Sequence, residues 1–242
     1  MMSSSAPARE FEWKGRTGPF VLRLSPSVFV PTHTSRLVAE ALEVHPGETV
    51  IDVGCGSGIL SFVAARLGAG RTYGTDISPE AVRVAADNAR RLGLEEHTEF
   101  RAGSLLEPLP GVVADVVVGD VSGIPDELAA ATDWFPGGHA GGPTGAEVPV
   151  AMLETVGEHL RPGGRLYLPT GSIQDERRVL ETARRLFGAA NLERVLEREL
   201  PLPALLARSK ALARMMAQGL VDLRRRGSRL LWRLAVWRCV RV

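Results

Sequence analysis

The 242-residue sequence has few cysteines, few aromatic residues and almost no lysine. Its two cysteines, Cys55 and Cys239, lack the close spacing of a metal-binding motif and lie too far apart to indicate a disulfide framework. No apolar run approaches the ~18 residues that a membrane-spanning helix requires. Residues 1–9 form a small polar tail without the apolar centre of a secretory signal. These absences predict a cytoplasmic protein with no structural metal and no membrane contact.

The remaining composition is that of an ordinary globular protein, with 45% apolar and 24% charged residues. A chain of this length suits one large domain with a sizeable core. We therefore expect a single domain over residues 1–242. Within it, residues 1–27 would form an N-terminal extension, and residues 200–227 a helical insertion before the last strand.

The net charge of +1 conceals an asymmetry along the chain. Residues 203–242 contain ten basic residues and one acidic residue, a net charge of +9, whereas the rest contains 19 basic and 27 acidic residues, a net charge of −8. Such a split indicates an acidic partner, a basic segment that docks on the protein's own acidic body, or simply a solvated arginine face. The sequence leaves these three interpretations open.

Short apolar stretches alternate with stretches of helical periodicity through most of the chain. This alternation predicts an α/β fold of the doubly wound, Rossmann-like type, with a mostly parallel seven-stranded sheet and helices on both faces. The last strand should pair antiparallel at the far side of the sheet. The expected strands cover residues 49–53, 71–76, 98–102, 112–119, 165–168, 192–199 and 228–242, and the expected helices cover 59–67, 80–92, 144–160, 175–187 and 205–223.

The strongest functional signal follows the first of these strands, in the segment Asp52-Val53-Gly54-Cys55-Gly56-Ser57-Gly58. Glycines after a buried strand permit a tight turn and the close approach of a ligand to the backbone. About twenty residues later Asp76 closes the next strand, where a carboxylate can accept both hydroxyls of a ribose; alternatively, it only caps the following helix. Cys55 is interpreted as a small buried residue and not as a nucleophile.

Asp-Val-Gly-Cys-Gly-Ser-Gly, followed by Gly-Thr-Asp-Ile-Ser-Pro-Glu-Ala, resembles the first two motifs of class I S-adenosylmethionine-dependent methyltransferases. The glycine spacing disfavours a nicotinamide dehydrogenase. The resemblance implies S-adenosylmethionine as cofactor, with its methionine part against the glycine turn, its ribose at Asp76 and its adenine near Ser104. The cofactor-binding residues that we predict in this way are Asp52, Gly54, Cys55, Gly56, Gly58, Asp76, Ile77, Gly103, Ser104, Asp120 and Thr34.

Residues 28–37 and 141–145 resemble the HemK-like branch of this class, which includes the release-factor glutamine methyltransferases. That branch carries Asn-Pro-Pro-Tyr after the fourth strand, where this chain has Asp120-Val121-Ser122-Gly123. We therefore do not expect methylation of glutamine or adenine. Asp120 is the first candidate catalytic residue, as a carboxylate that orients an amine or accepts its proton, although it could instead only cap the loop. His33 and His139 are further acid–base candidates.

These features favour methylation of an amine or hydroxyl on a small-molecule or peptide-like acceptor, in a biosynthetic role. The alternatives are methylation of a protein or RNA, with nucleic acid attracted by the basic C-terminal segment, or a non-methylating enzyme or binding module that uses the same cofactor. We expect the helix over residues 205–223, with Met215 and Met216, to project as one unit and to form a wall or lid of the acceptor pocket.

Overall fold

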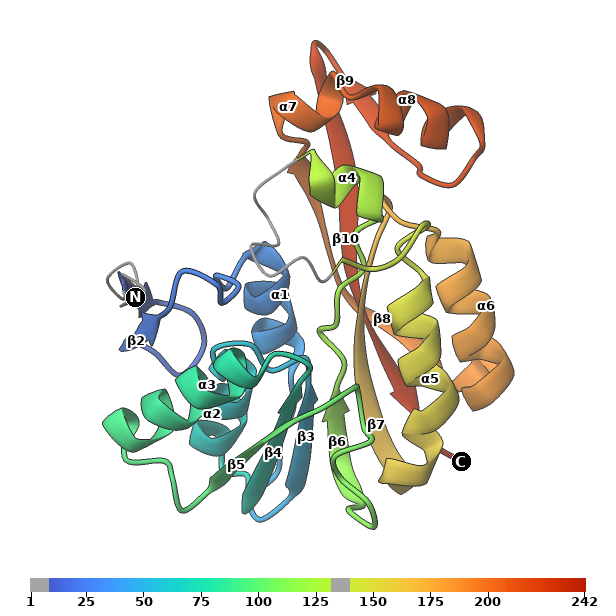
Figure 1. The fold of residues 1–242 in the computed structure, drawn as a ribbon. Coiled ribbons are helices and arrows are strands. Elements are labelled where there is room, and N and C mark those ends of the chain that lie inside the picture. The colour runs from blue at the N-terminus through green and yellow to red at the C-terminus, as the bar shows by residue number, and fades with distance from the viewer. Residues whose placement is uncertain (1–8, 132–139) are drawn as a thin grey trace.

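The computed structural model describes residues 9–131 and 140–242 and shows a three-layer α/β domain (Figure 1). The central sheet has the strand order β5-β4-β3-β6-β7-β10-β8, with β9 paired only to β10. Strands β3 to β7 run parallel, and β10 runs antiparallel to both of its long neighbours. The strands are β3 (Thr49–Val53), β4 (Arg71–Asp76), β5 (Thr98–Ala102), β6 (Ala114–Val118), β7 (Leu160–Gly171), β8 (Leu192–Pro201), β9 (Arg224–Arg226) and β10 (Arg229–Val240).

Helices cover both faces of the sheet, which confirms the predicted doubly wound fold (Figure 1). One face carries α1 (His33–Ala41), α2 (Ile59–Leu67) and α3 (Pro79–Leu92), and the other carries α5 (Glu147–His159) and α6 (Glu176–Phe187). Alternate residues of β3 supply the two cores: Val50 packs with the first group of helices, and Ile51 packs with the second. A strand buried on both faces therefore reads as the continuous apolar run seen in the sequence.

The helix α3 shows how local sequence sets the boundaries of these elements. The Ser78 hydroxyl accepts a hydrogen bond from the Ala81 amide, Pro79 occupies the first turn, and Gly93 ends the helix in a left-handed conformation. Each residue suits its position, because a short polar side chain satisfies a free amide, proline needs no partner there, and glycine tolerates positive φ. The predicted helix over residues 80–92 is thus present with both of its caps.

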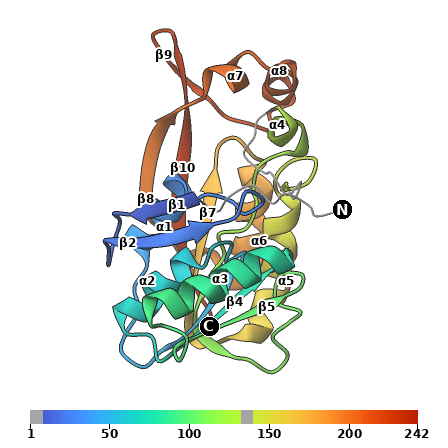
Figure 2. The same ribbon diagram turned by 60° about the vertical axis from the view of Figure 1, so that its left-hand side comes forward.

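The N-terminal segment contains a hairpin of β1 (Arg9–Trp13) and β2 (Phe20–Leu24). Figure 2 shows this hairpin lying against the layer of α2 and α3. Trp13 is fully buried and belongs to the first core, and the Asn88 side chain of α3 bonds the backbone of Arg23 in both directions. These contacts integrate the described part of residues 1–27 into the domain.

The C-terminal segment departs from the prediction of one helix over residues 205–223. It forms two short helices, α7 (Ala204–Ala207) and α8 (Lys210–Ala217), because Ser209 ends the first and caps the second by accepting a hydrogen bond from the Ala211 amide. Gly219, with φ of +69°, then turns the chain away. The three arginines that follow the expected helix form β9 (Arg224–Arg226), and residues 200–227 hold the end of β8, two helices and this strand.

Two further features on this side of the sheet differ from the prediction, one in the length of a strand and one in the order of the strands. The strand expected at residues 165–168 is longer than predicted, because β7 extends over 12 residues from Leu160 to Gly171. The last strand, β10, lies between β7 and β8 and leaves β8 at the edge of the sheet. Among the described residues, no helix combines the length and the apolar character needed to span a membrane.

Candidate functional site

A cavity of about 1060 Å³ opens at the carboxyl ends of the parallel strands. It lies where the strand order reverses, because β3 is followed by β4 on one side and has β6 on its other side. Loops diverge at such a point and leave a crevice, which is where ligands bind in open α/β sheets. The cavity is lined by residues that follow β3, β4 and β6, by the start of α1, and by β8 and β10.

The glycine turn after β3 forms one wall of this cavity. Gly54 and Gly56 line it with φ of +76° and +54°, and an added Cβ on Gly56 would meet no atom within 4 Å. The backbone above Gly56 is therefore open to a ligand. Gly58 is not among the lining residues; its φ is +88°, and a Cβ there would lie 2.6 Å from the Phe62 ring. Gly58 thus serves the packing of α2.

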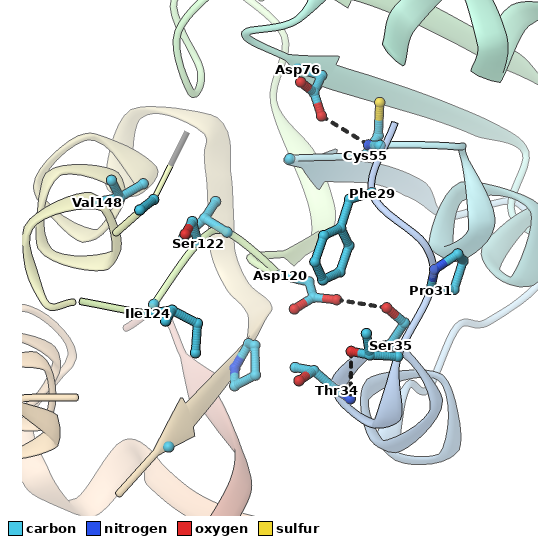
Figure 3. Close-up of a pocket in the computed structure, with 18 of the residues that line it drawn as sticks. Phe29, Pro31, Thr34, Ser35, Cys55, Asp76, Asp120, Ser122, Ile124 and Val148 are labelled. Atoms are coloured by element: carbon cyan, nitrogen blue, oxygen red, sulfur yellow. Dashed lines mark hydrogen bonds between the residues drawn. The ribbon is translucent and has the colours of Figure 1, made fainter. Parts of the chain in front are cut away.

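Asp76 ends β4 and faces the same cavity (Figure 3). Its Oδ2 accepts a hydrogen bond from the Gly56 amide at 2.9 Å, and its Oδ1 accepts one from the Ser78 amide at 2.9 Å. The carboxylate therefore braces both the glycine turn and the start of α3. Each oxygen still has acceptor capacity for a hydroxyl group, since an ionised carboxylate offers about four lone-pair sites.

Asp52 and Cys55 are the buried titratable groups beside the turn. The Asp52 Oδ2 accepts hydrogen bonds from the Ser61 amide at 2.9 Å and hydroxyl at 2.7 Å, whereas its buried Oδ1 has no partner among the described residues. Burial raises the pKa of Asp52 to about 7. Burial also raises the pKa of the Cys55 thiol well above its usual value, so Cys55 is a neutral, weakly nucleophilic group.

The far end of the cavity is formed by residues beyond β4 and β5. Ile77, Ser104 and Leu105 line it, and Ile77 is 54% exposed, which leaves an apolar surface facing the space. Leu105 has φ of +48°, a left-handed conformation that is uncommon for leucine. The predicted Gly103 does not line the cavity, because it packs against Pro108. No sequence motif singled out Leu105.

Asp120 follows β6 and lies in the middle of the cavity, between the Asp76 end and the side chains of Ile124 and Val148 (Figure 3). Its Oδ2 accepts a hydrogen bond from the Ser35 hydroxyl of α1 at 3.2 Å. Burial raises the pKa of Asp120 to about 6, and the bond from Ser35 opposes this rise. Asp120 is therefore ionised at neutral pH and can accept a proton. Ser35 lies in the segment 28–37 that resembles the HemK-like branch, but no motif there assigned it a role of its own.

The candidate histidines are placed less centrally than Asp120. His33 lines the cavity as the exposed first residue of α1, next to Thr34, which also lines it. His139 lies outside the described residues. Thr32 caps α1 by accepting a hydrogen bond from the Thr34 amide, which fixes this end of the helix at the rim.

The part of the cavity beyond Asp120 is mainly apolar. Trp232 and Leu234 of β10 contribute to it, together with Leu200 at the end of β8. No residue of α8 lines it. Met215 is instead buried in a cluster with Leu128 of α4 (Asp126–Ala130) and with Ile173, which itself lines the cavity, and Met216 is exposed. The structure therefore does not show α8 as a wall or lid of the cavity.

Residues 31–135 match the family model described as ribosomal protein L11 methyltransferase (PrmA). The chain is 35% identical over 187 residues to the release factor glutamine methyltransferase of Moorella thermoacetica, an alignment that covers 72% of this chain and 64% of that protein. It is 40% identical over 136 residues to the ribosomal protein L11 methyltransferase of Pelotomaculum thermopropionicum, covering 52% of this chain and 44% of the relative. The chain thus spans less than two thirds of these relatives.

Solved structures with the same fold include other methyltransferases. The L11 methylase of Lactobacillus delbrueckii subsp. bulgaricus superimposes with a TM-score of 0.54 and 22% identity, over 91% of this chain and 86% of that one. A 16S rRNA methyltransferase of T. thermophilus, solved with AdoMet and guanosine, gives a TM-score of 0.60 and 17% identity, over 98% of this chain and 51% of that one. At these identities the likeness concerns the fold.

The fold, the glycine turn and the match to the family model together make this chain similar to class I S-adenosylmethionine-dependent methyltransferases. Within that class, the sequence similarity is to PrmA-type and release-factor methyltransferases. These relatives are named for protein acceptors. They support the alternative of protein or RNA methylation better than the small-molecule acceptor that the sequence led us to expect.

Proposed function

We propose that the protein transfers a methyl group from S-adenosylmethionine to an amine nitrogen of a polypeptide acceptor. The observation that carries this proposal is the ionised Asp120 carboxylate in the middle of the cavity, where the related glutamine methyltransferases are expected to hold an asparagine. An anionic carboxylate suits a group that arrives as an ammonium ion and must lose a proton. It suits a neutral amide less well.

The cofactor fits the half of the cavity that the glycine turn forms. Asp76 retains acceptor capacity for two ribose hydroxyls, and the open backbone at Gly56 admits the methionine part. Ile77 and Leu105 offer apolar surface to the adenine. When bound, S-adenosylmethionine supplies a methyl group that its sulfonium charge has already activated. The protein then needs mainly to align an acceptor nitrogen with that group.

Asp120 would perform both the alignment and the proton transfer. Its carboxylate would accept a hydrogen bond from the acceptor ammonium and take the proton that frees the nitrogen lone pair. The lone pair then forms the bond to the methyl carbon, while the electron pair of the broken carbon–sulfur bond stays on sulfur. Ser35 holds the carboxylate in place through its hydroxyl. The proton leaves Asp120 for solvent through the cavity mouth.

The shape and charge of the cavity support a polypeptide acceptor. A volume of about 1060 Å³ lies at the upper end of the range for small-molecule sites, so it holds the cofactor together with an extended side chain. Trp232 and Leu234 provide apolar walls for an aliphatic stem, and Asp126 adds negative charge. A lysine side chain or an N-terminal amine has this combination of an apolar stem and a cationic tip.

A direct test incubates the purified protein with radiolabelled S-adenosylmethionine and, separately, with ribosomal protein L11, a peptide release factor and ribosomal RNA. We expect label in a protein, and hydrolysis should release a methylated amine. Recovery of methylglutamine would contradict the choice of an amine, and label in RNA alone would contradict the polypeptide acceptor. Asp120→Asn should abolish most of the transfer, whereas the surface variant Asp87→Asn should not.

A further inference from the structure

Nine of the ten basic residues in the C-terminal segment divide into two sets in the structure, and the tenth, Arg241, donates a hydrogen bond to the Leu160 carbonyl. The first set forms ion pairs with the protein's own acids, as in Arg214 with Glu127 and Arg224 with Glu199. Arg233 and Arg238 each contact two further glutamates. These residues agree with the interpretation in which the segment docks on the acidic body, because their charges are neutralised by acids of the same molecule.

The second set is not neutralised in this way. Five basic residues are exposed and form no ion pair with any residue that the structure describes. They lie at the end of α7, at the start of α8 and on the β9–β10 hairpin, and these elements gather at one end of the molecule in both ribbon views (Figures 1 and 2). We call this set the basic cap: Arg208, Lys210, Arg225, Arg226 and Arg229.

The hairpin places two of these charges directly opposite each other. Arg226 and Arg229 are Cα partners in the antiparallel pairing of β9 with β10, on either side of the turn at Gly227 and Ser228. Like charges at directly opposed positions destabilise a strand pair. The segment has a single acidic residue, the exposed Asp222, which precedes β9. The stability of the domain thus gives no reason for this arrangement, whereas a bound polyanion would neutralise it.

The basic cap is continuous with the acceptor side of the cavity. Trp232 lines the cavity and follows Arg229 by three residues on β10, a separation of about 10 Å along a strand. Pro201 and Pro203 line the cavity immediately before α7. An acceptor whose side chain enters the cavity from this side therefore brings its surroundings against the basic cap.

We propose that the basic cap binds the phosphate backbone of RNA that accompanies the polypeptide acceptor, so that the enzyme recognises a ribonucleoprotein. Four of its five residues are arginines, whose planar guanidinium groups bind phosphate in a bidentate manner. The partner assignment rests on the proposed function, because a separate polypeptide must fill the cavity. The binding of RNA itself does not rest on it and is measurable without cofactor or methyl transfer.

The experiment measures the fluorescence anisotropy of a labelled single-stranded RNA as the protein is added, at several salt concentrations. The test variant is the triple substitution Arg225→Gln, Arg226→Gln and Arg229→Gln. Each phosphate contact contributes about 0.7 to the slope of log affinity against log salt. We therefore expect the triple variant to reduce that slope by about 2 and to weaken binding at least tenfold at low salt.

The matched control carries Arg91→Gln, Arg177→Gln and Arg184→Gln. It removes the same charge from exposed positions on α3 and α6 that form no ion pair with any described residue. The proposal predicts binding close to that of the unaltered protein for this control. An equal loss in both triple variants, or unchanged binding in the test variant, would overturn it.

Two further measurements separate the remaining outcomes. Polyglutamate that binds as tightly as RNA of similar charge would reassign the basic cap to an acidic protein and overturn the RNA proposal. The test variant should still methylate an isolated polypeptide acceptor, while its preference for the RNA-bound form of that acceptor should disappear. Loss of RNA binding with transfer retained therefore supports the basic cap, and absence of transfer in all variants contradicts only the proposed function.

Discussion

At the scale of single residues, Asp76 has two roles, and any substitution at this position would affect both. It accepts hydrogen bonds from the Gly56 and Ser78 amides, and we propose that it also binds the ribose. The sequence offered these as alternatives, yet the structure allows both, because the carboxylate lies at the strand end with acceptor capacity to spare. A variant must therefore be checked for folding before its affinity is interpreted.

Replacing Asp76 by alanine should weaken the binding of S-adenosylhomocysteine by about 2 kcal/mol, since a bidentate, charge-assisted contact is lost. Calorimetry measures this change, and thermal unfolding of the free protein reports any loss of the two amide bonds. Asp76→Asn keeps one oxygen acceptor and should fall between the alanine variant and the unaltered protein. Unchanged affinity in both variants would remove Asp76 from the ribose site.

The hydrogen bond between Ser35 and Asp120 predicts how the methylation rate depends on pH. Burial raises the pKa of Asp120 to about 6, and a carboxylate acts as a base only when it is ionised. The methylation rate should therefore fall as the pH decreases through about 6. In Ser35→Ala, the bond that lowers the pKa of Asp120 is lost, so this acid limb should move to higher pH.

Asp120→Asn should lower kcat on the order of 100-fold above about pH 6, where Asp120 of the unaltered protein is ionised, because general base catalysis typically contributes at least that much. The difference should shrink at lower pH, and the variant should lack the acid limb. Cofactor affinity, measured by calorimetry, should change little. A Ser35→Ala profile that coincides with the original one would show that the limb belongs to another group, and His33 at the cavity rim would then be the next candidate.

At the scale of elements, the parallel strands β3, β4 and β5 were predictable to the residue. The strand β3 is a short, mostly apolar run followed by glycine, β4 ends at Asp76, and α3 carries both of its caps in its sequence. These signals are local. The cofactor half of the cavity follows from them, because the topology brings the ends of neighbouring strands together.

The C-terminal half was predicted less well because its structure depends on distant contacts. The apolar periodicity of residues 205–223 suggested one helix, but the Ser209 side chain competes for the backbone and divides it. The position of β10 between β7 and β8 depends on long-range pairing that no local pattern specifies. For the same reason Ser35, which reaches Asp120 from another element, was not identified.

The two methionines of α8 provide a matched test of this revised element. Met215 is 5% exposed and packs in the cluster of Leu128 and Ile173, whereas Met216 is 40% exposed. Met215→Ala should lower the free energy of unfolding by about 2–4 kcal/mol through loss of buried contacts. Met216→Ala should change it by less than about 0.5 kcal/mol. Urea unfolding measures both, and equal effects would contradict the burial of Met215.

At the scale of the whole molecule, the basic C-terminal segment contains arginines that are paired within the domain and others that are not. Arg233 and Arg238 of β10 pair with glutamates of α6, β8 and the segment after α1, and so help to hold the last strand within the sheet. The basic cap extends beyond this paired region. Of the interpretations that the charge asymmetry initially left open, the structure shows the one within the domain, and the outward one is our proposal for the basic cap.

The stability of the cofactor-free molecule should depend on pH through Asp52. Burial, with smaller effects of Asp120 and Asp76, raises the pKa of Asp52 to about 7 in the folded protein, against an ordinary value of 3.8. Between these values the folded state binds a proton that the unfolded state has released. The contribution of Asp52 is therefore fully present below about pH 4 and is lost as the pH rises to about 7.

Asp52→Asn should remove this dependence, because the amide is neutral at every pH and its oxygen can still accept from Ser61. The rise of the Asp52 pKa from 3.8 to about 7 corresponds to a change in the free energy of unfolding on the order of 4 kcal/mol. In urea unfolding, the free energy of unfolding of Asp52→Asn should rise relative to that of the unaltered protein from pH 4 to pH 8. The surface variant Asp87→Asn should show no such trend. The Asp120 carboxyl is present in both proteins, so its own titration largely cancels in the comparison. Parallel curves for Asp52→Asn and the unaltered protein would mean that Asp52 is already ionised when the cofactor site is empty, and the unpartnered Oδ1 would then have to be hydrated.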